Sequence, residues 1–175
     1  MIKVCISGRA CSGKTTLGNA LAEALNIEHI GNTYKAHVKS NKELAKFTLN
    51  ASKKFTNDFD KEIARKAAKT NCVVTTRLGP WMVKNATVRV WLNASDAERA
   101  RRFAKREGVT ARIAKASLTK IDGAVYRKFK KVYGIDVEND HDVFDMELCS
   151  ERMLTKEMVS MISLLAMERD GSSFR

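Results

Sequence analysis

Apolar and polar positions along the chain fall into blocks that predict strands alternating with helices. Short apolar runs without helical spacing are typical of strands buried in a parallel sheet. Such runs occupy Ile2–Ser7, Ile27–Ile30, Cys72–Thr76, Val88–Leu92 and Val143–Cys149. Helical spacing marks the segments between them, which are residues 14–25, 31–51, 56–69, 95–108, 110–133 and 155–168. Strands that alternate with helices predict a three-layer α/β fold with a parallel sheet.

The ends of several helices carry their own signals. Asn57 is a candidate N-cap of the helix over 56–69, and Ser95 with Glu98 forms a capping box for the next one. Gly108 and Gly134 are expected to end the two basic helices. Because the chain has no repeat and no Pro/Gly-rich linker, we expect one domain over residues 1–175.

A phosphate-binding loop follows the first predicted strand. Residues Gly8–Thr15 fit the Walker A pattern in full, and they open a predicted helix as that pattern requires. Backbone N–H groups at a helix N-terminus attract phosphates, Lys14 adds a charge for the β- and γ-phosphates, and the Thr15 hydroxyl suits Mg²⁺. The expected ATP-binding residues are Gly8, Arg9, Ala10, Cys11, Ser12, Gly13, Lys14, Thr15 and Thr16.

The positive charge of the chain is concentrated in one region. Residues 99–131 hold twelve basic and two acidic residues, which is a net +10 out of the total of +12. A local excess of this kind indicates a polyanion-facing surface. That surface could contact a nucleotide or a nucleic-acid backbone, although its aromatic residues are limited to Tyr126, Phe129 and Tyr133.

Cysteine content and hydropathy set the expected location. Four cysteines lack zinc-ligand or CxxC spacing, and Cys11 in the P-loop is interpreted as a small filler rather than a nucleophile. No apolar run is long enough to cross a bilayer, and Met1 leads into an apolar strand without a charged leader. We therefore expect a reducing cytoplasm and no membrane contact.

Four segments together resemble archaeal-type cytidylate kinases, which are P-loop nucleoside monophosphate kinases. They are the P-loop, Thr76–Met82, Glu98–Arg102 and Tyr133–Asp136, and the resemblance runs over nearly the whole chain. It implies a five-stranded parallel core (1–30, 70–98 and 135–175), a helical monophosphate-binding insertion (31–69) and a mobile basic lid (99–134).

The resemblance also assigns roles to single residues. Lys35 and Arg77 match positions that bind the acceptor phosphate, and Arg102 and Arg106 match lid arginines that reach the transferring phosphate. Arg127 and Asp136 match more loosely on the acceptor side. The remaining lid cations are expected on solvated helix faces: Arg99, Arg101, Arg112 and residues 128–131.

Two positions depart from the family pattern. Cys11 stands where many family P-loops have glycine, and Thr75 stands where an acidic residue is often found. A threonine can orient a metal-bound water but carries no charge. In the insertion, Asp58, Asp60 and Arg65 could contact the base or ribose, while Asp60 could equally be a first-turn residue favoured by the helix dipole.

The expected reaction is transfer of the γ-phosphoryl group of ATP to CMP, and also to dCMP, with Mg²⁺ held by Thr15 through the nucleotide. The attacking phosphate oxygen is already ionised at neutral pH, so no general base is needed, and none is evident in the sequence. Alternatives are another small acceptor (AMP, UMP or a non-nucleotide acid) or a non-catalytic protein that binds nucleic acid through residues 99–131. We expect a monomer.

Overall fold

Five parallel strands form the central sheet of the computed structural model, which describes residues 1–31, 43, 47 and 50–171. The strand order is β2-β3-β1-β4-β5. The strands are β1 (Lys3–Ser7), β2 (Glu28–Ile30), β3 (Cys72–Val74), β4 (Val88–Asn93) and β5 (Met146–Cys149). The sheet places the carboxyl ends of β3, β1 and β4 side by side, which is where open parallel sheets bind ligands.

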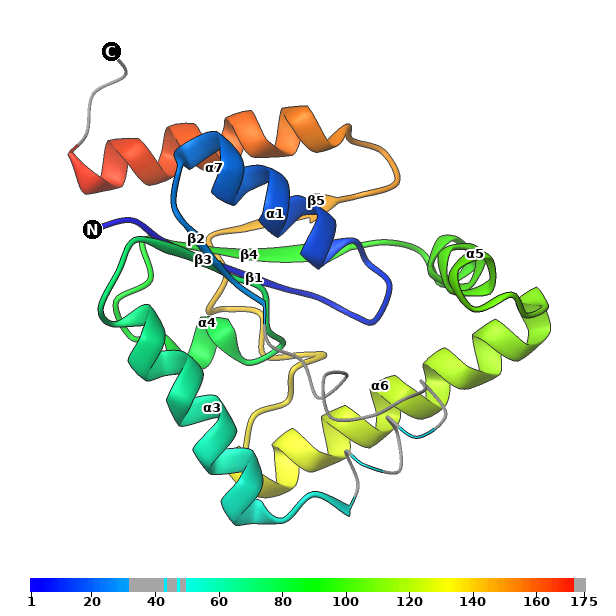
Figure 1. The fold of residues 1–175 in the computed structure, drawn as a ribbon. Helices are drawn as coiled ribbons and strands as arrows, with labels where there is room; N and C mark the ends of the chain where they lie inside the picture. The colour runs from blue at the N-terminus through cyan, green and yellow to red at the C-terminus, as the bar shows by residue number, and fades with distance from the viewer. Residues whose placement is uncertain (32–42, 44–46, 48–49, 172–175) are drawn as a thin grey trace.

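Helices cover both faces of this sheet (Figure 1). On one face lie α1 (Lys14–Leu25) and α7 (Thr155–Asp170), and on the other lie α3 (Lys53–Ala67) and α4 (Gly79–Met82). The pair α5 (Asp96–Glu107) and α6 (Ala111–Tyr133) extends beyond the sheet. The prediction of a three-layer α/β fold with a five-stranded parallel sheet is confirmed.

Burial on both faces explains why the strands are continuously apolar. Every residue of β1 is buried, with Val4 and Ile6 packed in the cluster that contains Leu17 of α1. Cys5 points to the opposite cluster with Ile63 of α3. The period-2 alternation of a strand therefore gives both layers an apolar surface.

The ends of α5 and α6 follow the predicted signals with one exception. Gly108 and Gly134 adopt left-handed conformations at φ 64° and 73°, as expected of helix C-caps. The Ser95 hydroxyl accepts a hydrogen bond from the Glu98 N–H at 3.2 Å. A capping box also requires the Glu98 carboxylate to accept the Ser95 N–H. That part of the prediction is wrong, because the Glu98 carboxylate pairs with neighbouring arginines instead.

Two predicted boundaries are also wrong. Helix α3 begins at Lys53, since the Ser52 hydroxyl caps the Phe55 N–H at 3.0 Å, so Asn57 lies inside the helix. The last strand begins at Met146 rather than at residue 143, because the Asp145 carboxylate accepts the Arg89 N–H. In both cases a short polar side chain takes over a main-chain donor.

The two basic helices are packed onto the core by apolar contacts. An apolar cluster joins α5 to the first half of α6 and includes Ala10 and Cys11 of the P-loop; its buried members are Ala100, Phe103, Ala114, Leu118 and Ile121. The second half of α6 packs through Val125 and Phe129 against Trp91 of β4. No helix in the described ranges is long and apolar enough to span a membrane.

Candidate active site

The P-loop turns sharply between β1 and α1. Gly8 and Gly13 have φ angles of 145° and 102°, which side-chain-bearing residues rarely adopt. A Cβ on Gly8 would lie 2.3 Å from the Leu92 carbonyl oxygen, so the loop can follow this path only with glycine there. The turn leaves the start of α1 open to an anion.

Cys11 adopts a left-handed conformation with φ 61°. A positive φ favours glycine, so a cysteine here carries some backbone strain. The half-buried Cys11 side chain packs against the cluster of Ala100 and Phe103. The packing supports a filler role and offsets part of the backbone strain.

Lys14 is turned back onto its own loop. Its Nζ donates hydrogen bonds to the carbonyl oxygens of Gly8 and Arg9 at 2.9 and 2.7 Å. Burial, followed by the positive charge of Arg77, lowers the pKa of Lys14 to about 7. A triphosphate placed in the loop would reverse this effect, because an anion favours the charged ammonium.

Arg77 stands directly beside the P-loop because β3 and β1 are neighbours. The Ser7 hydroxyl at the end of β1 donates to the Arg77 carbonyl at 2.7 Å. The Arg77 guanidinium contacts Asp122 at 3.1 Å, and the side chain remains 17% exposed. Arg77, the residue that the sequence analysis assigned to the acceptor phosphate, therefore lies near Lys14 with its guanidinium partly exposed to solvent.

The residues Asp122 and Arg99 were missed by the sequence interpretation. Arg99 was expected on a solvated face, but its side chain is 2% exposed and bonds to Asp122 at 2.7 Å and to the Ala10 carbonyl at 3.0 Å. A signal was present: Asp122 interrupts the apolar stripe of α6 between Ile121 and Val125. A carboxylate on a buried face requires a cationic partner.

The two predicted lid arginines have different partners. Arg102 donates from NH1 to the Ser12 carbonyl at 3.0 Å, from NH2 to the Ser150 carbonyl at 2.9 Å and from Nε to Glu98 at 2.7 Å, which ties it to the outside of the P-loop. Arg106 is half exposed, and it pairs with Glu107 at 2.7 Å. The i,i+4 spacing places both on one side of α5 but does not bring them to a shared partner in this conformation.

The proposed acceptor residues are spread over α3, α6 and the segment after α6. Asp60 lies in the middle of α3, so the first-turn interpretation is wrong. It is 6% exposed and accepts a hydrogen bond from the Tyr133 hydroxyl at 2.7 Å, and burial raises its pKa to about 6. Arg127 is exposed on α6, while Asp136 pairs with Lys130 at 2.8 Å. Lys35 lies outside the described residues.

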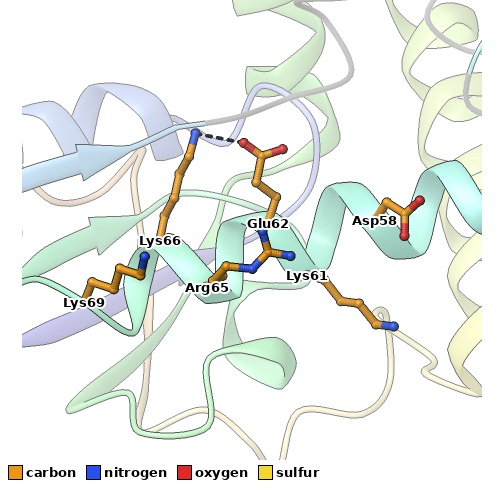
Figure 2. Close-up of a pocket in the computed structure, with 6 residues that line it drawn as sticks. All are labelled: Asp58, Lys61, Glu62, Arg65, Lys66 and Lys69. Carbon is orange, nitrogen blue, oxygen red and sulfur yellow. Dashed lines mark ion pairs between the residues drawn. The ribbon is translucent and has the colours of Figure 1, made fainter.

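A charged pocket runs along one side of α3 (Figure 2). Its lining side chains repeat at helical spacing, and Lys66 and Glu62 form an ion pair at 3.0 Å. The lining residues are Asp58, Lys61, Glu62, Arg65, Lys66 and Lys69. Asp58 and Arg65, the candidate base or ribose contacts, therefore belong to this pocket, whose lining includes no P-loop residue.

Among the described residues, the P-loop side chain suited to bind a metal ion is the Thr15 hydroxyl. Thr15 is exposed in the first turn of α1, and the Thr75 hydroxyl lies 2.8 Å from His29 Nε2. Among the residues that the structure describes, no three His, Cys, Asp or Glu side chains are grouped as metal ligands. Mg²⁺ would therefore be held by Thr15 and mainly by the phosphates themselves. The buried Ser12 and Tyr126 hydroxyls have no hydrogen-bond partner within the described ranges.

The Walker A loop between β1 and α1, with cations from β3 and α5 around it, defines a P-loop protein with a kinase fold. Solved structures agree on the fold. An uncharacterized protein from Eubacterium ventriosum has a TM-score of 0.70 at 17% identity, covering 94% of this chain and 97% of that one. Shikimate kinase from Bacteroides thetaiotaomicron has a TM-score of 0.62 at 18% identity, with the same coverage of 94% and 97%.

Sequence comparisons give the family. The model of the cytidylate kinase-like family matches residues 32–152. A cytidylate kinase of Thermococcus kodakarensis is 35% identical over 82% of this chain and 76% of its own length. A cytidylate kinase of Sulfurisphaera tokodaii is 29% identical over 91% of this chain and 92% of its own length. The chain belongs to the cytidylate kinase-like family.

Proposed function

We propose that this protein transfers the γ-phosphoryl group of ATP to CMP and dCMP, producing ADP and the corresponding diphosphate. The observation that carries the proposal is the adjacency of a complete P-loop and Arg77 at one sheet edge, in a chain whose curated relatives are cytidylate kinases. Phosphoryl transfer needs positioning and charge neutralisation, and this arrangement supplies both.

The donor side consists of the P-loop and the start of α1. Main-chain N–H groups of residues 8–16 bind the phosphates of ATP, and Lys14 leaves the Gly8 and Arg9 carbonyls to contact the β- and γ-phosphates. Thr15 would hold Mg²⁺ together with the nucleotide, and the ion would supply positive charge at the phosphate oxygens. Arg102 supports the loop from outside through the Ser12 carbonyl.

The acceptor side consists of Arg77 with Lys35, and of Asp60, Arg127 and Asp136 around the nucleoside. A guanidinium suits the terminal phosphate of a monophosphate because it can donate two parallel hydrogen bonds. The acceptor oxygen is ionised at neutral pH, so the reaction requires no general base. Asp60 stands at the contact between α3 and α6, and this supports a position close to the nucleoside.

Residues 99–134 close over the bound nucleotides as a lid. The positive charges of this segment repel one another until an anion arrives. On closure Arg102 exchanges the Ser12 carbonyl for the transferring phosphate and Arg106 approaches the same phosphate, while the buried Arg99–Asp122 contact persists. A closed lid also excludes water, which would otherwise hydrolyse ATP. We place the enzyme in the cytoplasm, and we expect it to be a monomer. Light scattering of the purified protein measures its oligomeric state.

A coupled ADP-release assay with ATP and a panel of nucleoside monophosphates tests the proposal. CMP and dCMP should give the highest kcat/KM, and Lys14→Ala should reduce turnover by about 10²-fold or more, since a preorganised charge is lost. A higher kcat/KM with AMP, UMP or a non-nucleotide acid would show that CMP is not the preferred acceptor. No turnover, together with RNA binding that falls steeply with salt, would replace the enzyme by a nucleic-acid binder.

A further inference from the structure

Asp122 occupies an unusual position for a carboxylate. It lies on the buried face of α6 with 4% of its side chain exposed, and cationic or N–H donors surround both of its oxygens. Oδ2 is 2.7 Å from Arg99 NH1 and 3.7 Å from Arg9 Nε. Oδ1 accepts from Arg77 NH2 at 3.1 Å and from the Ala10 main-chain N–H at 3.2 Å.

This donor set is the one that proteins use to bind a phosphate. Guanidinium groups together with a main-chain N–H of a P-loop are the usual partners of phosphate oxygens. The two donors at Oδ1 come from opposite sides of the proposed reaction: Ala10 belongs to the donor loop, and Arg77 belongs to the acceptor site. The carboxylate of α6 therefore bridges the two places that the substrates need.

Two of the arginines around Asp122, Arg99 and Arg77, differ in how easily they can exchange Asp122 for another partner. Arg99 is 2% exposed and is also held by the Ala10 carbonyl and by Asp96, so these contacts fix its guanidinium in place beside Asp122. Arg77 is 17% exposed, and within the described ranges its ion-pair partner is Asp122. An incoming phosphate can therefore compete for Arg77 but not for Arg99.

We propose that Asp122 is a positioning residue that stands in for a phosphate oxygen: it aligns Arg77 with the P-loop in the nucleotide-free enzyme and releases Arg77 to the acceptor phosphate. Asp122 keeps its contact with Arg99 throughout, so α6 stays attached to the P-loop while Arg77 changes partner. This role rests on the proposed function, since it assigns Arg77 to the acceptor. The negative charge of Asp122 competes with the acceptor phosphate for Arg77. Asp122 therefore lowers the affinity for CMP while it keeps Arg77 aligned with the P-loop.

Asp122→Asn tests this role, because it keeps the shape of the side chain and removes its charge. Titration calorimetry should show CMP and inorganic phosphate binding about three- to tenfold more tightly, the scale of one partly screened competing charge. The kcat should fall by about tenfold, because a neutral amide holds the Arg99 guanidinium and the Ala10 N–H less firmly than a carboxylate does, and the P-loop is then less well aligned. A merely structural carboxylate would instead weaken binding and lower kcat together.

Asp96→Asn is the matched control. Asp96 pairs with Arg9 and Arg99, both at 2.9 Å, whereas Arg77 and the Ala10 N–H bond to Asp122. Its loss should change CMP affinity and kcat by less than about twofold, as expected of a mostly exposed ion pair. Equal effects of Asp122→Asn and Asp96→Asn would overturn the inference.

Crystal structures of the wild-type protein with and without CMP decide the question even if Asp122→Asn does not fold. With CMP bound, Arg77 should contact the phosphate and lie beyond hydrogen-bonding distance of Asp122, while the Arg99–Asp122 contact persists. Arg77 still bound to Asp122 in that complex would overturn the inference. If the wild-type protein phosphorylates no monophosphate, the proposed function fails, and the inorganic-phosphate titration still decides whether Asp122 competes with an anion.

Discussion

At the scale of single residues, Lys14 and Arg77 each have partners within the protein at the site. Lys14 is held by two carbonyls of its own loop, and its pKa of about 7 leaves the ammonium half protonated at neutral pH. The same residue type on a solvated surface would be fully charged there. Nucleotide binding must therefore change the protonation of Lys14 as well as its contacts.

MgATP binding should take up protons through Lys14. The phosphates restore the charged form, so the uptake should be about half a proton at pH 7 and approach one proton above pH 8, and affinity should weaken as pH rises from 7 to 9. Calorimetry in buffers of different ionisation enthalpy measures the uptake. Lys14→Met is the control, and an equal uptake in that variant would assign the protons to another group.

Arg77→Ala should separate the two nucleotide sites. Because Arg77 lies at the end of β3 and is proposed to hold the acceptor phosphate, its loss should raise the KM for CMP by about 10²-fold and change ATP affinity little. Calorimetry with each nucleotide alone gives the two affinities. Loss of ATP binding with CMP binding retained would move Arg77 to the donor side.

At the scale of elements, α5 and α6 combine firm anchoring with an excess of charge. Apolar residues on one side of each helix pack against the P-loop and β4, and cations other than the buried Arg99 lie on the remaining sides. Hydroxyl caps at Ser95 and Thr110 and left-handed glycines at the C-termini make both helices well defined. A movement of these helices would therefore be a rearrangement of packed elements.

Hydrogen exchange should detect such a movement. When ATP and a non-reactive CMP analogue bind together, amide exchange over residues 99–131 should slow, because anions relieve the repulsion between the cations. Each ligand alone should protect its own site more than it protects these helices. Protection at Gly8–Thr15 with no change over residues 99–131 would contradict lid closure.

At the scale of the whole molecule, the Asp60–Tyr133 hydrogen bond joins α3 to the end of α6, two elements far apart in sequence. The bond brings a carboxyl group into a buried environment that disfavours its charge. The free energy of unfolding should therefore depend on pH in part through Asp60. An aspartate whose folded pKa is raised binds more protons in the folded state, so its contribution is present at low pH and is lost as pH rises.

Asp60→Asn should remove this dependence. The folded pKa is about 6 and the reference value is 3.8, so the variant should gain stability relative to wild type between pH 4 and pH 6. The gain should total about 3 kcal/mol, since each pKa unit is worth about 1.4 kcal/mol, and it should stay constant above pH 7. Urea unfolding at several pH values measures the difference. A free energy difference that does not vary with pH would show that Asp60 is ionised normally.

Much of the fold was predictable because local patterns carried it. The Walker A residues, the apolar strands and the capping residues of α5 and α6 act through their immediate neighbours, so the helix over Lys14–Leu25 was predicted to the residue. The errors occurred where a nearby side chain competed for the same group, as at Ser52 and Asp145. Such competition depends on geometry that a linear pattern does not contain.

The sequence by itself determined which chemistry is present: a phosphate-binding loop, an arginine after β3 and a strongly basic segment. Only the tertiary structure decided which cations belong together. Arg99 and Arg101 are two positions apart in the same basic helix, yet the first is buried against Asp122 and the second is 67% exposed. The physical reason is that Asp122 follows Arg99 by 23 residues and reaches it only because α6 folds back onto α5 and the P-loop. That packing buries Asp122, so its carboxylate must pair with the arginines that the fold brings next to it. The other cations of the basic segment stay in solvent although they are chemically similar.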